Sequence, residues 1–466
     1  MTQAERLARF LVRISYEDLS EHAREQIKIR VLDGLGCAIG ALAGPPIRTL
    51  RVHLADFGGA ERCSLIGGGR SAPDRAAMYN SALVRYLDFN DSYLAKGETC
   101  HPSDNIGPVL AAAEYAQRSG RNFMTALAAA YQVQCRLSDV APVRAKGFDH
   151  TTQGSYAVAA GVTKALGLDE MRTAHALAIC GTAFNALRVT RTGALSNWKG
   201  LAYPNMASGC TQAAFLAMRG ITGPLEVFEG NKGFMDAIAG RFEIDWAAEN
   251  LERVTQTILK KYNAEVHSQS ALEGILELKA EGAFRPEDVA RIELETFDVA
   301  YNIIGGGEEG GKTTIRTKEE ADHSLPYMLA VAVLDGQVMP EQYLPERIAR
   351  PDVQTLLRKV TVRPTEEFSR RFPEEMPCRV TVVLEDGRKL VKEKHDYEGF
   401  RTRPMRWETV VGKFERLSAP YADATLRGRI VDAVARLEAV RTADLMALLG
   451  EVRAPDLSTG QAAARH

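Results

Sequence analysis

The sequence predicts a mainly α fold, in which an all-helical body formed by the N- and C-terminal segments carries a smaller α+β lid domain. Three features support this prediction. Residues 1–270 hold a succession of apolar patterns at helical spacing, the chain from about residue 285 is rich in β-branched residues, and its last part returns to helical spacing. We place the first part of the helical domain at 1–268, the lid at 269–400 and the helical return segment at 401–466.

The predicted helices of the body are rich in Ala and Gly, and several are apolar on most sides. Such helices are buried and pack closely against one another. The segments with this pattern include 16–40, 74–87, 106–120, 123–137, 154–168, 171–187 and 207–220. Helical spacing also predicts helices at 405–417 and 427–440, while the tail STGQAAARH is expected to fray.

The lid is predicted from three β-rich stretches: VARIELETF (289–297), RKVTVRP (358–364) and CRVTVVL (378–384). The last of these continues through Asp386-Gly387 into RKLVKEK, which is typical of a β-hairpin. RIELETF alternates apolar and polar residues, which indicates a half-exposed antiparallel strand.

Composition excludes several classes of function. A net charge of −2 gives no support to nucleic-acid binding, and the seven widely spread cysteines contain no C-x-x-C pair. This spacing disfavours a zinc site, a disulfide framework and an iron–sulfur dehydratase, so we expect no metal and no cofactor. With no long apolar run and no signal-peptide core, the chain is expected to be a cytoplasmic protein with no membrane contact.

One motif raises a competing hypothesis. GGEEGGKT (306–313) spells G-x-x-x-x-G-K-[ST], the pattern of a phosphate-binding loop. A working loop of this kind joins a buried strand directly to a helix, whereas eight residues separate RIELETF from Gly306 and no apolar helical stripe follows. Glu308 and Glu309 would also repel phosphates. We therefore expect a Gly-rich loop or a hinge of the lid, with a nucleotide site as the alternative.

Polar clusters between apolar helices mark four candidate sites. They are Asp88, Asp91, Ser92 and His101 within 86–105; Arg188, Arg191 and Lys199 within 185–205; His267 within 260–276; and Asp322-His323-Ser324. Each cluster alone is also consistent with a capped loop or a solvated turn. Together, cations and histidines without a cofactor motif suit a small polycarboxylate substrate. Arg and Lys bind carboxylates, and an imidazole removes a proton alpha to one of them.

These segments carry a resemblance to a known family. LDFNDSYLAKGETCHPSDN (87–105), the segment around Lys199, AEVHSQS (264–270) and EADHSLPYMLAVAVLDG (320–336) resemble the MmgE/PrpD family over nearly the whole chain. The resemblance implies a helical body with an α+β lid, a homodimer and cofactor-independent chemistry. It places His101 and His267 as an acid/base pair, Lys199 and Ser92 on the substrate, and Asp88 as an orienting group.

Within the family, Arg188, Arg191 and Lys199 favour a tricarboxylate. The resemblance therefore implies a hydro-lyase like 2-methylcitrate dehydratase, with substrate bound by Ser92, Asp91, Arg188, Arg191 and Lys199. An epimerase acting on an iminodisuccinate-like acid and a decarboxylase acting on a cis-aconitate-like acid stay open. Ala202 stands where many members have histidine. A non-catalytic helical dimer is the remaining alternative.

Overall fold

The computed structural model describes residues 1–282 and 284–453, which form two compact units. Unit 1 comprises 1–189, 200–257 and the chain from 406 onward; unit 2 comprises 190–199 and 258–405. The fold is mainly α, with a small α+β part, as predicted. The predicted boundaries after residues 268 and 400 stay predictions of the domain organisation, and the tail from 458 lies outside the described residues.

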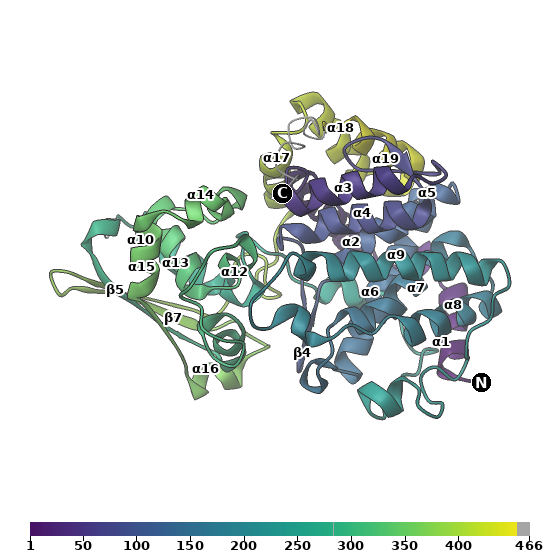
Figure 1. The fold of residues 1–466 in the computed structure, drawn as a ribbon, viewed down its shortest axis with the longest axis horizontal. Coiled ribbons are helices and arrows are strands. Elements are labelled where there is room, and N and C mark those ends of the chain that lie inside the picture. The colour runs from purple at the N-terminus through teal and green to yellow at the C-terminus, as the bar shows by residue number, and fades with distance from the viewer. Residues whose placement is uncertain (283, 454–466) are drawn as a thin grey trace. The chain divides into compact units, whose positions relative to one another are not determined.

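Unit 1 is a helical assembly with two short hairpins (Figure 1). Its helices are α1 (Gln3–Arg13), α2 (Glu21–Gly40), α3 (Pro45–Phe57), α4 (Pro73–Tyr86), α5 (Ile106–Tyr115), α6 (Gly120–Val140), α7 (Thr151–Leu166), α8 (Glu170–Ala183), α9 (Trp198–Met218), α17 (Trp407–Ser418), α18 (Ala424–Ala435) and α19 (Thr442–Glu451). The first two residues of α9, Trp198 and Lys199, are assigned to unit 2. The hairpins pair β1 (Cys63–Ser64) with β2 (Arg70–Ser71) and β3 (Tyr93–Ala95) with β4 (Glu98–Cys100). The second hairpin lies inside the polar cluster at 86–105, where the sequence predicted only a loop.

Small residues let the helices of unit 1 approach closely. A Cβ at Gly107 of α5 would lie 2.3 Å from the backbone nitrogen of Ser81 on α4. The C-terminal helix α17 packs on α2, where a Cβ at Gly36 would lie 3.2 Å from Phe414 Cα. The return segment therefore belongs to the same core as the N-terminal helices, as the sequence predicted.

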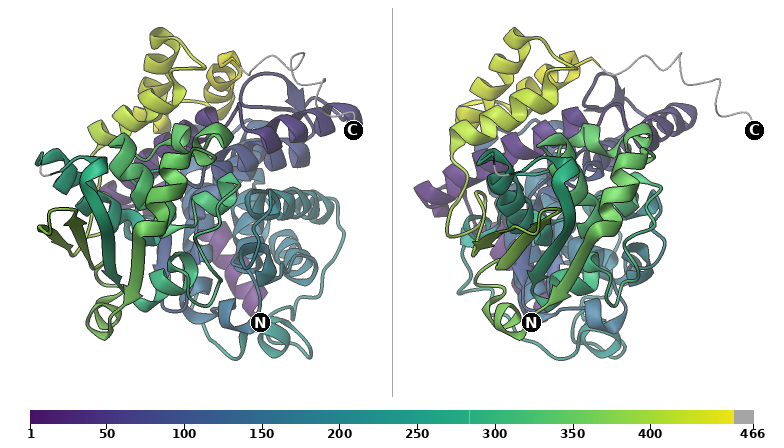
Figure 2. Two further views of the ribbon diagram at one scale, coloured as in Figure 1. Left: turned by 60° about the vertical axis from the view of Figure 1, so that its left-hand side comes forward. Right: turned by 90° about the vertical axis from the view of Figure 1, so that its left-hand side faces the viewer.

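Unit 2 is built around a four-stranded sheet of order β6-β5-β7-β8. Its strands are β5 (Val289–Thr296), β6 (Val360–Pro364), β7 (Cys378–Leu384) and β8 (Lys389–Lys394), and its helices are α10 (Gln269–Ala280), α11 (Asp298–Ala300), α12 (Lys318–Ala321), α13 (Leu325–Asp335), α14 (Pro345–Ile348), α15 (Pro351–Leu356) and α16 (Glu366–Arg371). Helices α10 and α13 pack on the sheet, which Figure 2 shows from two further sides. The core between them contains Leu272, Ile292, Val380 and Tyr327.

The sheet confirms the predicted hairpin and corrects one strand. β7 and β8 pair antiparallel through a turn in which Gly387 has a φ of 86°. β5 does alternate in burial and pairs antiparallel with β7, but its other neighbour, β6, is parallel. Parallel pairing needs a long crossover, here the helices between 298 and 359, and it cannot be inferred from one alternating segment.

The structure does not give GGEEGGKT the setting of a phosphate-binding loop. A π-helical turn at Tyr301–Gly305 precedes it, and the next helix is the short α12, which begins only at Lys318. The Ser324 hydroxyl donates to the Lys312 carbonyl over 2.6 Å and ties the loop to the start of α13. Since no strand leads into the loop and no helix follows it directly, the nucleotide alternative loses its structural basis.

Candidate active site

The first group of predicted site residues lies in unit 1, beginning where the chain leaves α4. Asp88 adopts a φ of 55°, an uncommon conformation for a residue other than glycine. The Asp88 carboxylate accepts a hydrogen bond of 2.7 Å from the Arg85 guanidinium, whose Nε lies 3.7 Å from the Asp104 carboxylate. Burial alone lowers the pKa of Arg85, but Asp88 and Asp104 outweigh it and raise this pKa. The Asp88 side chain is thus held by a buried cation.

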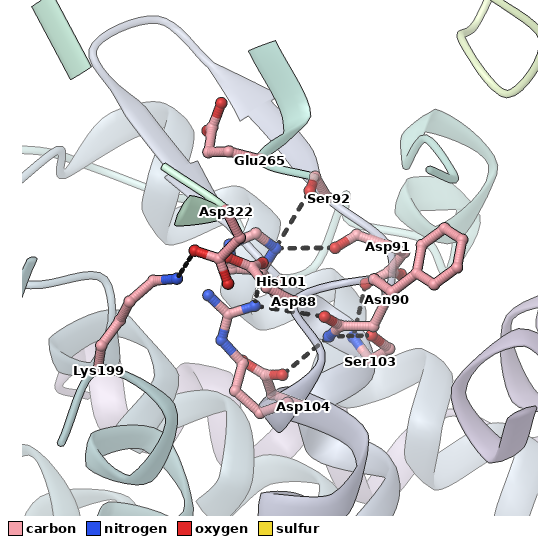
Figure 3. A network of polar contacts seen from close by, with 12 residues as sticks. Asp88, Asn90, Asp91, Ser92, His101, Ser103, Asp104, Lys199, Glu265 and Asp322 are labelled. Atoms are coloured by element: carbon pink, nitrogen blue, oxygen red, sulfur yellow. Dashed lines mark hydrogen bonds and ion pairs between the residues drawn. The ribbon is translucent and has the colours of Figure 1, made fainter. Parts of the chain in front are cut away.

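His101 is held by the loop that carries Asp91 and Ser92 (Figure 3). Its Nδ1 atom lies 2.8 Å from the Asp91 carbonyl oxygen and 3.1 Å from the Ser92 hydroxyl. Because a carbonyl oxygen can only accept, the Nδ1 atom carries the proton. In the neutral imidazole the lone pair is therefore on Nε2, which is the nitrogen that can accept a proton.

The Asp91 side chain binds the protein itself. One carboxylate oxygen accepts from the Ser103 backbone nitrogen at 3.0 Å and the other from the Tyr131 hydroxyl at 2.8 Å. Burial raises the pKa of this carboxyl group, because its hydrogen-bond donors are neutral. These contacts give Asp91 a part in shaping the loop that presents Ser92 and His101.

Arg188 connects to His101 through two residues that the sequence analysis did not select. Its Nη1 atom lies 3.9 Å from the buried Asp149 carboxylate, and Asp149 also accepts from the Thr151 backbone at the start of α7. The next residue, His150, is buried, and its ring centroid lies 5.4 Å from that of His101. Asp149 and His150 directly precede α7 in the chain. Only the tertiary contact reveals the place of His150 beside His101.

The second group lies in unit 2 and centres on Asp322. The Lys199 ammonium donates to Asp322 over 2.9 Å, as Figure 3 shows, and the Lys318 ammonium donates to the second oxygen over 2.6 Å. The His323 Nδ1 atom lies 2.7 Å from the same carboxylate. Burial raises the pKa of Asp322, but Lys199 and Lys318 outweigh burial and hold it well below its usual range. The Asp322-His323 pair noted in the sequence is therefore an anionic support for Lys199.

His267 is held by Glu265, two residues before it. One Glu265 oxygen lies 2.7 Å from His267 Nδ1, and the other accepts from the His267 backbone nitrogen at 2.8 Å. The backbone nitrogen of Glu265 donates to the Asp322 carbonyl, which joins this dyad to the Lys199 cluster. Burial raises the pKa of Glu265, but His267, His323 and Lys260 lower it to about 2. The E-x-H spacing was visible in the sequence and was overlooked.

Two further cations accompany Lys199 in unit 2. Arg191 is buried and donates to the Lys199 carbonyl over 3.1 Å, so it fixes the backbone that carries the lysine. Lys312, from the Gly-rich loop, is also buried; desolvation and the charge of Lys199 lower its pKa, while Glu309 and Glu265 act in the opposite direction. The motif that resembled a phosphate-binding loop thus adds a lysine to this group.

The structure accordingly sorts the predicted site residues into two clusters, each described within its own unit. Unit 1 brings together Asp88, Asp91, Ser92, His101 and Arg188, and unit 2 brings together Arg191, Lys199 and His267. Of the predicted catalytic residues, His101 in unit 1 and His267 in unit 2 each have Nδ1 fixed by a protein acceptor, and Asp322 holds Nδ1 of the neighbouring His323 in the same way. That both clusters act on one substrate stays a prediction.

Comparison with known families decides the classification of this chain. The MmgE/PrpD N-terminal domain matches residues 5–247 and the MmgE/PrpD C-terminal domain matches residues 262–439. The chain belongs to the MmgE/PrpD family. A short segment between residues 247 and 262 separates the two matched regions. The family that LDFNDSYLAKGETCHPSDN resembles is thereby confirmed.

Several relatives in the MmgE/PrpD family carry names that describe an activity. The chain is 26% identical to a mitochondrial 2-methylcitrate dehydratase of Yarrowia lipolytica, over 83% of this chain and 78% of the relative. It is 25% identical to a 2-methylcitrate dehydratase of Escherichia coli, over 80% of each chain, and 27% identical to an alkylcitrate dehydratase of a fungal species, over 84% of this chain and 83% of the relative. The predicted enzyme class, a carbon–oxygen lyase, is confirmed by these relatives. Across the described residues, no helix has the length and apolarity needed to span a bilayer.

Proposed function

We propose that this chain is a hydro-lyase that removes water from a small citrate-like di- or tricarboxylate, as the relatives named 2-methylcitrate dehydratase do, without a cofactor. The observation that carries the proposal is the pair of fixed imidazoles: His101 and His267 each present Nδ1 to a protein acceptor at 2.8 and 2.7 Å. In both rings Nε2 is thereby assigned to proton transfer. One imidazole takes a proton and the other delivers one, which is what elimination of water requires.

The reaction balances with these groups alone. A base removes the proton alpha to a carboxylate, the electrons of the C–H bond form the new C=C bond, and the C–O bond breaks. An acid protonates the departing hydroxide, which leaves as water. Negative charge develops on the substrate carboxylate during proton removal, and fixed cations lower the energy of that charge.

The substrate carboxylates are assigned to the cations of both clusters, Lys199, Arg188 and Arg191. Ser92 serves as a hydroxyl partner for the substrate, with Asp91 shaping its loop, and Asp88 orients the site through Arg85. Lys199 binds substrate through the same ammonium that donates to Asp322 over 2.9 Å. We also propose that the protein acts as a cytoplasmic homodimer; light scattering in solution tests the oligomeric state.

Ultraviolet absorbance of the unsaturated product, recorded with 2-methylcitrate and related citrate-like acids, tests the proposed function. We expect turnover by the native protein and a loss of about 10²–10⁴-fold in kcat for His101→Ala and for His267→Ala. Native turnover of these acids by both variants would overturn the proposal. Solvent deuterium in recovered substrate without unsaturated product would instead indicate an epimerase, and carbon dioxide release a decarboxylase.

A further inference from the structure

The Glu265–His267 pair in unit 2 holds an imidazole in one fixed orientation. Proton transfer requires such a fixed orientation, whereas a histidine that only fills space does not require it. The two Glu265 oxygens bind the ring and the backbone of the same residue, at 2.7 and 2.8 Å. Such a two-point contact fixes the rotation of the imidazole as well as its tautomer. We propose that Glu265 is a positioning residue that sets His267 as the base of the elimination, with His101 as the acid. This inference rests on the proposed function.

The second nitrogen of His267 supports this role. Nε2 is buried and has no hydrogen-bond partner among residues 1–282 and 284–453. A buried polar atom without a protein partner is stabilised when a ligand supplies one, and a substrate proton would do so at Nε2. The ring packs against Phe297 and Phe372, with centroids 5.7 and 5.6 Å away, and these neighbours offer Nε2 no competing acceptor or donor.

The two imidazoles differ in what holds Nδ1. In His267 the acceptor is a carboxylate, whereas in His101 it is the neutral Asp91 carbonyl together with the Ser92 hydroxyl. When a base takes up a proton the ring becomes an imidazolium, and an adjacent carboxylate stabilises that cation. A neutral acceptor stabilises it less. The ring held by Glu265 is therefore the better proton acceptor, and the ring held by a carbonyl gives its proton up more readily.

The charges around the pair keep Glu265 ionised. His323 and Lys260 act on Glu265 directly, and Asp322 with Lys199 lies beyond the Glu265 backbone. Lys312 faces the same carboxylate from the Gly-rich loop. Other groups near the pair are the two Phe rings, the exposed Asp298 of α11 and Glu273 of α10, which binds Lys394. The buried Tyr397 also faces Glu265, and burial together with the Glu265 charge raises the pKa of this tyrosine.

The positioning role is tested by the pH profile of kcat/KM on 2-methylcitrate for the native protein, Glu265→Gln and Glu265→Asp. Glu265→Gln should lower kcat roughly 10²-fold with little change in KM. Because the imidazolium loses its carboxylate partner, the acidic limb of the profile should move to lower pH. Glu265→Asp should restore part of kcat and the native position of the limb. Glu273→Gln, another buried carboxylate of unit 2, is the matched control and should leave the limb in place.

The assignment of base and acid is tested with the analogue of 2-methylcitrate in which fluorine replaces the tertiary hydroxyl. Fluoride leaves as an anion and needs no proton, so its release requires the base and not the acid. We expect His267→Gln to lose about 10³-fold in fluoride release, while His101→Gln stays within roughly 10-fold of the native rate.

The outcomes separate the two levels of inference. Absence of native dehydration of every citrate-like acid overturns the proposed function. Native dehydration combined with an unshifted acidic limb in Glu265→Gln overturns the role of Glu265. A larger loss of fluoride release in His101→Gln than in His267→Gln, or an equal loss in both, overturns the assignment of His267 as the base.

Discussion

Two buried carboxylates of unit 1, Asp91 and Glu98, and three of unit 2 are held in opposite electrostatic states. In unit 1, burial raises the pKa of Asp91 and of Glu98, whose hydrogen-bond donors are backbone N–H groups, the Tyr131 hydroxyl and an amide. In unit 2, burial acts in the same direction on Asp322, Glu265 and Glu273, yet the pKa of each is lowered. The difference lies in the partners, since ammonium, guanidinium and imidazole groups surround the second set.

The comparison shows that burial depth does not determine the charge of an acid. Neutral donors compensate only part of the cost of burying a carboxylate, whereas cations compensate more than the whole of it. Unit 1 therefore uses Asp91 and Glu98 as hydrogen-bond acceptors that shape loops. Unit 2 keeps an array of alternating charges that stays ionised at neutral pH, as a site for anionic substrates requires.

The largest expected effect is in Asp322→Asn. The variant leaves Lys199, Lys318 and His323 around a neutral amide, and breaking a buried ion pair costs about 3–5 kcal/mol. We expect the free energy of unfolding of unit 2 to fall by about this amount, measured by amide hydrogen exchange in α12 and α13. Asp352→Asn, at a partly exposed ion pair with Arg347, should cost about 1 kcal/mol or less. Equal losses in both variants would break the comparison.

Glu273→Gln should give the next largest effect. The variant removes the anion that binds Lys394 at 3.0 Å and Arg403, and part of that charge is screened because Arg403 is half exposed. We expect a loss of about 2–3 kcal/mol in the denaturant-derived free energy of unfolding of unit 2. Glu98→Gln in unit 1 is the matched variant with neutral partners, and its loss should be no more than about 1 kcal/mol.

Acid should destabilise the two units to different extents in the native protein. Glu265 and Glu273 have a pKa of about 2 in the folded protein and 4.5 as free groups, so their contribution to stability is complete above pH 4.5 and is lost as the pH falls toward 2. We expect unit 2 to lose about 1–2 kcal/mol over the first pH unit below 4.5. For Asp91 and Glu98 the effect of acid on stability has the opposite sign, because protonation removes the cost of burying a charged carboxylate. Hydrogen exchange that weakens first in unit 1 on acidification would contradict this.

The smallest effect is expected for Asp91→Asn. An asparagine can accept from the Ser103 backbone with its oxygen and donate to the Tyr131 hydroxyl with its amide. Since burial disfavours the charged form at this position, loss of the charge should change the free energy of unfolding of unit 1 by no more than about 0.5 kcal/mol. A destabilisation as large as that of Asp322→Asn, measured by chemical denaturation, would remove the distinction between the units.

The elements that the sequence predicted well are those specified locally. The Asp386-Gly387 hairpin and the helices of unit 1 follow from patterns within some twenty residues. The parallel pairing of β5 with β6 was missed because their residues are joined across the sheet, with Ile292 opposite Val360. The hairpin of β3 and β4 was missed because its short strands are embedded in polar loop sequence.

The candidate site divides in the same way. Ser92 and His101 are nine residues apart in one polar segment, and the sequence selected both as site candidates without predicting their contact. The Lys199–Asp322 pair spans 123 residues, and spacing cannot reveal such a partner. Asp149 and His150 were not selected, because nothing in their spacing relates them to His101, whose ring centroid lies 5.4 Å from that of His150. Glu265 was a different kind of miss, because an acid two residues from a histidine is legible in the sequence.

The excursion of residues 190–199 into unit 2 limits how this protein can be divided. The chain passes from one unit to the other four times, so the continuous piece 258–405 omits the decapeptide that ends in Lys199. A fragment of residues 258–405 would lack Lys199, so Asp322 would lose this ion-pair partner. The charges around the Glu265–His267 pair would change as well. Modular exchange of the smaller unit between relatives therefore requires four junctions rather than two, with the decapeptide transferred together with the sheet.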